Sequence, residues 1–335
     1  MLRVIKSLLI LVFIGVLLIF GAGLWWLQEP MPLRLQPGSQ VVDLEIEFGT
    51  PASGVAEIVV ESGATVPVLL LQAWFRLSGQ ARLIKAGNYE IEQSTSPRKL
   101  LSMLVRGEEA LKSVTLVEGW TFLQVRTALQ KAEHLTPDTL GLSPEMIMKN
   151  IDKSGIHPEG RFFPDTYTYA KGASDLTVLK RAARVMDKRL AAAWAVRSAN
   201  TPLKTPEQAL ILASIVEKET GKTSDRAQIG GVFSNRLRIG MLLQTDPTVI
   251  YGLGQQFDGN LRKRDLLADT PYNTYLRAGL PPTPIAIPGK AALLAAVQPA
   301  NTKALYFVAR GDGSSQFSSS LDEHNRAVNK YIRGQ

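Results

Sequence analysis

The hydrophobic pattern begins with a long apolar run near the N-terminal end of the chain. Residues 7–27 carry no charged side chain, and most of these positions are aliphatic or aromatic. A helix of about 20 apolar residues crosses a hydrocarbon core about 30 Å thick. The pattern therefore predicts a transmembrane helix over 7–27.

A cleaved signal peptide is the alternative explanation of this run. Its apolar part would be shorter and would end at small residues such as those at 21–23. Here the apolar run continues past them to Leu27, and Trp25 and Trp26 suit the interfacial aromatic belt of a membrane span. We therefore expect the helix to be retained as an anchor.

The flanking charges predict the orientation of this anchor. Arg3 and Lys6 precede the run, whereas Gln28, Glu29 and Pro30 follow it. The positive flank of a membrane helix stays in the cytoplasm. We expect residues 1–6 in the cytoplasm, a single pass through the inner membrane, and the rest of the chain in the periplasm.

A small α+β module is expected directly after the anchor. Residues 28–39 contain three prolines and are interpreted as a linker. Within 40–112, alternating positions predict strands in 41–58, a helix over 64–77, and a turn leading into a strand over 85–91. Ser96 and Pro97 are typical of a helix start, so a helix is expected through Arg106.

The remainder, 113–335, is predicted to be a helix-rich α+β domain. Long helical patterns cover 176–198, 205–220 and 224–239, the last ending at Gly240. A hairpin is expected from 305–309 and 316–318, with its turn at 311–313, followed by a closing helix over 321–332.

The helix over 205–220 carries the candidate chemistry. Thr205, Pro206 and Gln208 form a start signal with a capping box, and Gly221 supplies a stop. Residues 209–216 are apolar on nearly every face, which predicts a buried helix. A glutamate at its end should have a raised pKa, and a protonated glutamate near neutral pH can serve as a general acid.

Two glutamates compete for this role. Glu217 shares a helical face with small side chains such as Ala213 and Ser214, which would leave room for a ligand. Glu219 follows a bulkier stripe over 212–216, which would desolvate it more strongly. The smaller face favours Glu217, while two surface glutamates at a fraying helix end remain the alternative interpretation.

Other polar groups cluster in loops. Thr245 or Asp246 is expected to cap a helix that begins at Pro247, beside Gln244. The loop 270–275, which contains Asn273 and Tyr275, suits a sugar chain and equally suits an ordinary ordered loop. The segment 159–167 is interpreted as a site edge or a domain clasp, and Asn325 as a surface position in the last helix.

Composition narrows the function classes. The net charge of +8 suits an anionic partner, but no long Lys/Arg run or basic–aromatic alternation supports nucleic acid. The absence of cysteine excludes disulfides, thiolate metal sites and a cysteine nucleophile. The three histidines show no metal-ligand spacing, so neither a metal nor another cofactor is expected.

Four segments carry a resemblance to a known family: 159–167, 213–220, 235–241 and 243–252. The segments 272–275 and 279–282 and the pair His324 and Asn325 match as well. The chain resembles the YceG-like family of membrane-anchored endolytic murein transglycosylases. The resemblance extends over nearly the whole chain, although 37–80 matches poorly.

The resemblance implies a LysM-like module at 40–112 and a YceG-like catalytic domain at 113–335. It implies that Glu217 is the essential catalytic residue. The reaction would cleave the bond between N-acetylmuramic acid and N-acetylglucosamine in nascent peptidoglycan, leaving 1,6-anhydro ends. Such cleavage would end strand growth, so peptidoglycan synthases are expected as further partners beside the glycan strands and the inner membrane.

One carboxyl group can suffice for this chemistry. Ordinary glycosidases use two carboxylates, whereas a lytic transglycosylase uses the C6 hydroxyl of its own substrate. We expect Glu217 to protonate the leaving oxygen and then to accept the C6 hydroxyl proton. Gln244, Asn273 and Tyr275 are expected to orient the acetamido group or stabilise charge, and Glu219 or Asp246 remains open as a second carboxylate. Asn325 is a further candidate for binding the substrate or supporting the site.

Two other functions fit parts of the same pattern. A muramidase would hydrolyse the same bond with water and leave reducing ends. A non-catalytic peptidoglycan-binding scaffold that recruits cell-wall synthases would bind sacculi and produce no new ends. The ends of the product strands therefore distinguish the three hypotheses.

Overall fold

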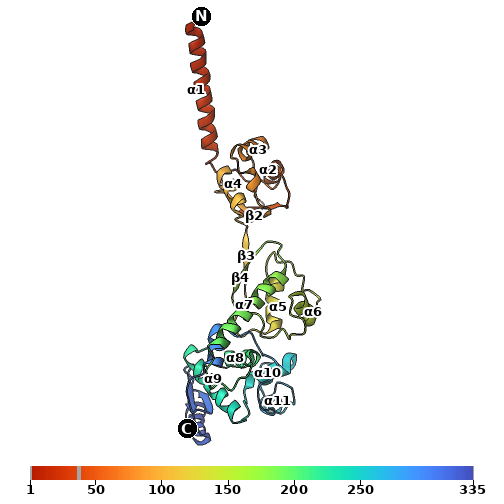
Figure 1. Cartoon of the computed structure of the whole chain (residues 1–335), viewed down its shortest axis with the longest axis vertical. Coiled ribbons are helices and arrows are strands. Elements are labelled where there is room, and N and C mark those ends of the chain that lie inside the picture. Colours follow the sequence, from red (N-terminus) through yellow and green to blue (C-terminus); the bar gives the residue numbers. More distant parts are fainter. Residues whose placement is uncertain (1, 36–38, 335) are drawn as a thin grey trace. The chain divides into compact units, whose positions relative to one another are not determined.

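The computed structural model describes residues 2–35 and 39–334. The fold is mixed α+β and mostly helical, and three two-stranded sheets occur within the described ranges. The chain divides into two compact units, Met1–Lys112 and Ser113–Gln335, which are described separately. Figure 1 labels their helices and strands.

The first unit begins with the apolar helix α1 (Leu2–Trp26). Its segment Leu9–Trp26 is long and apolar enough to cross a membrane, and none of this segment is buried inside the protein. A single apolar N-terminal helix was expected from the sequence and is confirmed. Its retention as an anchor and its orientation stay predictions, because length and composition also suit a signal sequence.

A small α+β module follows α1 in the same unit. Strand β1 (Val41–Ile46) pairs antiparallel with β2 (Gly87–Glu92), with Val41 opposite Glu92. Between the strands lie α2 (Ala52–Glu61), α3 (Val68–Leu77) and the short helix η1 (Ala81–Leu83), and α4 (Pro97–Arg106) follows β2. Their apolar faces form one core that includes Leu44, Val55, Phe75, Tyr89 and Leu100.

Two predictions for this module were wrong. The segment 41–58 is a strand only to Ile46, and helix α2 starts after Pro51. Val55, Ala56 and Val59 reach the core at helical spacing, so tertiary burial overrides the strand preference of the two valines. The helix expected over 64–77 begins later, at Val68.

Part of the segment predicted to be a linker, 28–39, packs into the module. The Met31 side chain is buried, and its backbone N–H donates to the Thr95 carbonyl at 2.9 Å. The Arg34 N–H donates to the Gly63 carbonyl at 2.8 Å, and Leu33 forms a β-bridge with Ala64. Pro30 and Pro32 therefore lie in an edge segment that packs into the module, whereas residues 36–38 of the predicted linker lie outside the described residues.

The start of α4 matches its prediction. The Ser96 hydroxyl accepts a hydrogen bond from the Lys99 N–H at 3.3 Å, and Pro97 occupies the first turn of the helix. Gly107, with φ +71°, ends the helix in the left-handed region. Both termini follow from local capping chemistry alone.

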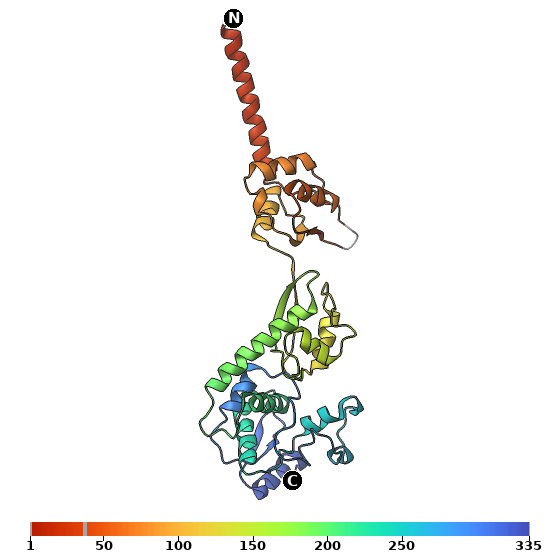
Figure 2. The same ribbon diagram turned by 45° about the vertical axis from the view of Figure 1, so that its right-hand side comes forward.

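The first strand of the second unit is β3 (Leu111–Thr115), whose first two residues belong to the first unit. It pairs with β4 (Thr166–Ala170). Two cores share the long helix α7 (Asp175–Ala195). The early turns of α7, including Val178 and Ala182, pack with α5 (Phe122–Lys131) and α6 (Pro144–Asn150). The later turns, including Met186 and Leu190, join the second core, and Figure 2 shows α7 running between the two groups of elements.

The second core surrounds α8 (Pro206–Glu219). It includes residues of α9 (Thr223–Arg238), α12 (Lys290–Val297) and the β5–β6 hairpin (Tyr306–Ala309, Ser315–Ser318). The smaller elements are α10 (Asp246–Leu253), η2 (Gly254–Gln256), α11 (Lys263–Leu266), α13 (Leu321–Val328) and the π-helical turn η3 (Asn329–Arg333). The hairpin and the end of α9 at Gly240 occur where they were predicted.

Helix α8 is buried all round, as predicted, since every residue from Ala209 to Val216 is buried. Thr205 caps it by accepting from the Gln208 N–H at 3.2 Å. The predicted capping box was wrong, because the Gln208 side chain accepts from the Lys204 N–H at 2.7 Å instead. The predicted glycine stop was also wrong, since Thr220 already leaves the helix with extended backbone.

Because α9 and α12 pack closely at Gly230, adding a methyl group there is predicted to destabilise the folded protein. A Cβ at Gly230 would lie 2.3 Å from the Ala295 carbonyl oxygen, whereas a Cβ at Gly221 would meet open space. We expect Gly230→Ala to lower the free energy of unfolding by about 2 kcal/mol and Gly221→Ala to change it little. Urea denaturation followed by circular dichroism measures both, and equal stabilities of the two variants would contradict the packing described here.

Candidate active site

An open cavity of about 400 Å³ lies at the C-terminal end of α8. Ten residues from six segments of the second unit line it: Glu219, Arg236, Leu243, Gln244, Asp246, Tyr275, Tyr306, Phe307, Leu321 and His324. The cavity thus brings together four residues predicted from the sequence, namely Glu219, Gln244, Asp246 and Tyr275. Within the described ranges, no group of three or more acidic or histidine side chains could hold a metal ion.

Glu219 is the buried acid of this cavity. The Thr245 hydroxyl donates a short hydrogen bond to its Oε1, and its Oε2 has no hydrogen-bond donor among the described residues. Burial raises the pKa of Glu219, and the nearby charge of Asp246 raises it further. The Thr245 hydrogen bond and the Arg236 charge act in the opposite direction without reversing the shift.

The turn before α10 positions the Thr245 hydroxyl for its hydrogen bond to Glu219. Gln244 has φ +47°, and its N–H donates to the Thr274 carbonyl at 3.0 Å. The Thr245 N–H donates to the Thr274 hydroxyl at 3.1 Å. Thr245 was predicted as a possible side-chain cap of α10, but it occupies the cap position without a capping hydrogen bond, and its hydroxyl serves Glu219 instead.

The loop 270–275 supplies one cavity residue and one structural residue. The Tyr275 hydroxyl donates to Asp246 Oδ1 at 2.5 Å, and burial raises the pKa of Tyr275. Asn273 is fully buried, and its amide donates to the Leu266 and Ala268 carbonyls at 3.0 and 2.7 Å. Asn273, predicted to contact substrate, therefore fixes the loop and does not line the cavity.

Six of the ten lining residues were not predicted from the sequence, and three of these six, Arg236, Tyr306 and His324, contact one another. Arg236 donates to the Leu305 and Leu243 carbonyls at 2.7 and 2.8 Å, and its guanidinium lies 5.3 Å from the centre of the Tyr306 ring. His324 stacks on the same ring at 5.2 Å. The pair at 324–325 was noticed, but Asn325 is exposed on α13 and does not line the cavity.

Glu217 lies outside the cavity, as expected for a residue turned by about 200° from Glu219 on a helix. Only 4% of its side chain is exposed. Arg226 donates to its Oε1 at 3.0 Å, and the Gly289 N–H donates to its Oε2 at 2.9 Å. Burial raises the pKa of Glu217, against the opposing effects of the Gly289 N–H and Arg226.

The expectation of an open face beside Glu217 was wrong. Ser214 is fully buried, its hydroxyl donates to the Ile211 carbonyl at 2.7 Å, and the same hydroxyl accepts from the Ile285 N–H at 3.0 Å. The segment 285–289 therefore fills the space that the small side chains leave. Glu118 is a second acid near Arg226, at 3.7 Å. The guanidinium of Arg226 is therefore paired with both Glu217 and Glu118.

The segment 159–167 acts as a clasp within the second unit. Glu159 accepts from the Phe122 N–H at 2.9 Å and from the Tyr251 hydroxyl at 3.1 Å. Arg161 donates to Glu207 at 2.6 Å, which ties the same segment to the first turn of α8. Burial raises the pKa of Glu159 to about 7.

These features define an α+β protein in which a buried helix carries an acid to the wall of a polar cavity. The YceG-like family model matches residues 44–330. The chain belongs to the YceG-like family.

Curated relatives and a solved structure agree with this membership. An endolytic murein transglycosylase of Bacillus subtilis is 30% identical over 94% of this chain and 91% of its own length. Another of Streptococcus pneumoniae is 28% identical over 74% of this chain, which spans about half of that relative. A crystal structure of a yceG-like protein from Listeria monocytogenes aligns with a TM-score of 0.55 at 28% identity, over 86% of this chain and 98% of that one.

Glu159 predicts how stability depends on pH. Its pKa is about 7 in the folded state against 4.5 as the reference value, so the folded protein binds the extra proton between these values. Folding stability is therefore lost as pH rises through this window, by about 2 kcal/mol between about pH 5 and pH 8. In urea denaturation, the Glu159→Gln variant should lack this part of the slope, and identical slopes would contradict the assignment.

Proposed function

We propose that this protein is an endolytic lytic transglycosylase that cleaves the β-1,4 bond between N-acetylmuramic acid and N-acetylglucosamine in peptidoglycan strands. Family membership and the names of relatives at about 30% identity support the reaction class. The observation that carries the proposal for this chain is Glu219, a buried acid on the wall of an open polar cavity.

Glu219 is proposed as the acid and base in place of Glu217. Glu219 faces a cavity shared with Gln244, Asp246 and Tyr275, and burial favours its protonated form. Glu217 is held by Arg226 and the Gly289 N–H, which occupy both of its oxygens and favour its charged form. A proton donor needs an accessible, protonated oxygen, so the geometry supports Glu219.

The proposed reaction needs one carboxyl group. Glu219 gives its proton to the glycosidic oxygen as the bond from C1 of the muramic acid breaks. The resulting carboxylate takes the proton of the C6 hydroxyl while that oxygen bonds to C1. The acid is restored, no water is consumed, and the product is a 1,6-anhydro end. Intramolecular attack benefits from a high effective concentration of the hydroxyl.

The surrounding side chains have distinct proposed roles. Thr245 holds Oε1 of Glu219 and so directs Oε2 to the cavity. Gln244 and Tyr275 line the cavity as hydrogen-bonding groups for the sugar and its acetamido group. Asp246 raises the pKa of Glu219, which keeps the acid protonated at higher pH.

The rest of the chain is proposed to bring this site to its substrate. Helix α1 serves as an inner-membrane anchor with a cytoplasmic N-terminus, and the module at 40–112 as a LysM-like binding unit for glycan. Cleavage beside the membrane would end the growth of nascent strands. Peptidoglycan synthases are the partners that this placement favours.

Matched amide variants test the assignment of the acid. The full-length protein is incubated with uncrosslinked glycan strands, and mass spectrometry identifies the new ends. We expect products lighter by one water than hydrolysis products from the natural chain. Glu219→Gln should lose activity by about a thousandfold, because it removes the general acid and base, whereas Glu217→Gln should retain most of it.

The other outcomes are equally informative. An inactive Glu217→Gln beside an active, folded Glu219→Gln would return the role to Glu217. Reducing ends would indicate hydrolysis and a second carboxylate, with Asp246 as the candidate in the cavity. Binding to sacculi without new ends would support the non-catalytic scaffold.

The neighbours of Glu219 predict opposite shifts of the pH profile. A general acid acts when protonated, so activity should fall as pH rises through its pKa. Asp246→Asn removes a charge that raises this pKa, so the fall should move to lower pH. Thr245→Val removes a hydrogen bond that lowers it, so the fall should move to higher pH. Profiles of kcat/KM that shift together, or not at all, would exclude Glu219 as the titrating acid.

A further inference from the structure

Helix α3 (Val68–Leu77) of the first unit exposes a row of leucines. Leu69 is 78% exposed and Leu77 is 84% exposed, and Leu70 lies beside them. The opposite side of α3 is buried through Leu71 and Phe75. Leu69, Leu70 and Leu77, called here the α3 leucine face, lie within about 100° of one another around the helix axis and so expose apolar side chains on one side of α3.

This face lies next to the point where α1 meets the module. Leu27 is buried there, and its carbonyl accepts from the Arg98 N–H at 3.2 Å. The Trp74 indole of α3 donates to the carbonyl of Pro97, the residue before Arg98, at 3.2 Å. Figures 1 and 2 both draw α3 beside this end of α1. A bilayer crossed by α1 would therefore begin at the level of α3, because no spacer separates the apolar span from the module.

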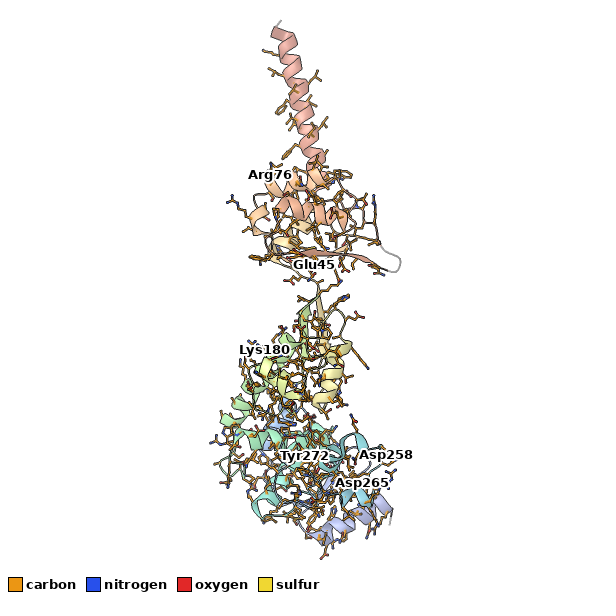
Figure 3. All side chains as sticks on the ribbon, turned by 90° about the vertical axis from the view of Figure 1, so that its right-hand side faces the viewer. Glu45, Arg76, Lys180, Asp258, Asp265 and Tyr272 are labelled. Carbon is orange, nitrogen blue, oxygen red and sulfur yellow. The ribbon has the colours of Figure 1, made fainter. Side chains whose placement is uncertain are left out.

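Two exposed arginines lie at this end of the module, together with the exposed Glu29 directly after α1, and two exposed glutamates lie at or near the other end. Arg76 lies on α3 and Arg98 at the start of α4, and both are exposed. Glu45 and Glu47 are exposed at and just after β1. In Figure 3, Arg76 lies at the α1 end of the module and Glu45 at the opposite end. Basic side chains are attracted to anionic headgroups and acidic ones are repelled, so this polarity suits one orientation on a lipid surface.

We propose that the α3 leucine face, flanked by Arg76 and Arg98, docks into the anionic surface of the bilayer that α1 crosses. An apolar helical face with basic neighbours is the pattern of an interfacial helix. Docking would fix the orientation of the module on the membrane. The inference rests on the membrane anchorage proposed above, and it is independent of the catalytic residues.

Single cysteines can probe this contact, because the natural chain contains none. Leu69→Cys and Leu77→Cys report on the face, Glu45→Cys on the opposite end, and Leu18→Cys on the anchor. Each full-length variant is labelled with an environment-sensitive fluorophore and reconstituted into vesicles of phosphatidylcholine and phosphatidylglycerol. Quenching by aqueous iodide and by lipids with brominated acyl chains is then compared.

We expect labels at 69 and 77 to lose most of their iodide quenching and to be quenched by the brominated lipids, whereas the label at 45 behaves in the reverse way. Vesicles of phosphatidylcholine alone should weaken this protection several-fold. Iodide access at 69 and 77 equal to that at 45, with lipid quenching at 18, would overturn the docking while leaving the anchor intact. Shielding from both quenchers would indicate a protein partner and also overturn it, and no lipid quenching at 18 would refute the anchor itself.

Discussion

The structure depends on one constraint, the burial of the central part of α8, Ala209–Val216, on every side. Eight consecutive side chains of this helix are buried, so its position is fixed on every side by α7, α9, α12 and the segment 285–289. A helix held in this way fixes the positions of the carboxyl groups in its last turn, those of Glu217 and Glu219. Burial also withdraws them from water, which favours their protonated forms. The pKa of both Glu217 and Glu219 is raised for this reason.

The two glutamates share a helix end and differ in their neighbours. Arg226 and the Gly289 N–H satisfy Glu217, so its charge is compensated where it is buried and it ties α8 to α9 and to the start of α12. Glu219 receives a hydrogen bond from Thr245 on one oxygen, and the residue lines an open polar cavity. One carboxylate is therefore suited to holding the structure, and its neighbour to exchanging a proton with a ligand.

Much of this arrangement could be predicted from local sequence. The uniform apolar run at 209–216 predicts burial of α8, and capping chemistry predicts the starts of α4 and α8. The proposed choice of Glu219 over Glu217 could not be made from local sequence, because it rests on residues about 70 positions away that fill the space beside Ser214. The burial of Asn273 could not be predicted for a similar reason, since its amide partners are fixed by the fold of the loop. The strand preference of 41–58 was overridden by packing against the module core.

The most direct test of this account is a crystal structure of the Glu219→Gln variant with an uncrosslinked glycan oligomer bound. The account predicts that the oligomer occupies the cavity beside Gln244 and Tyr275, with a glycosidic oxygen within hydrogen-bond distance of the side chain at position 219. An oligomer bound instead against Glu217, with Arg226 displaced and this cavity empty, would contradict it.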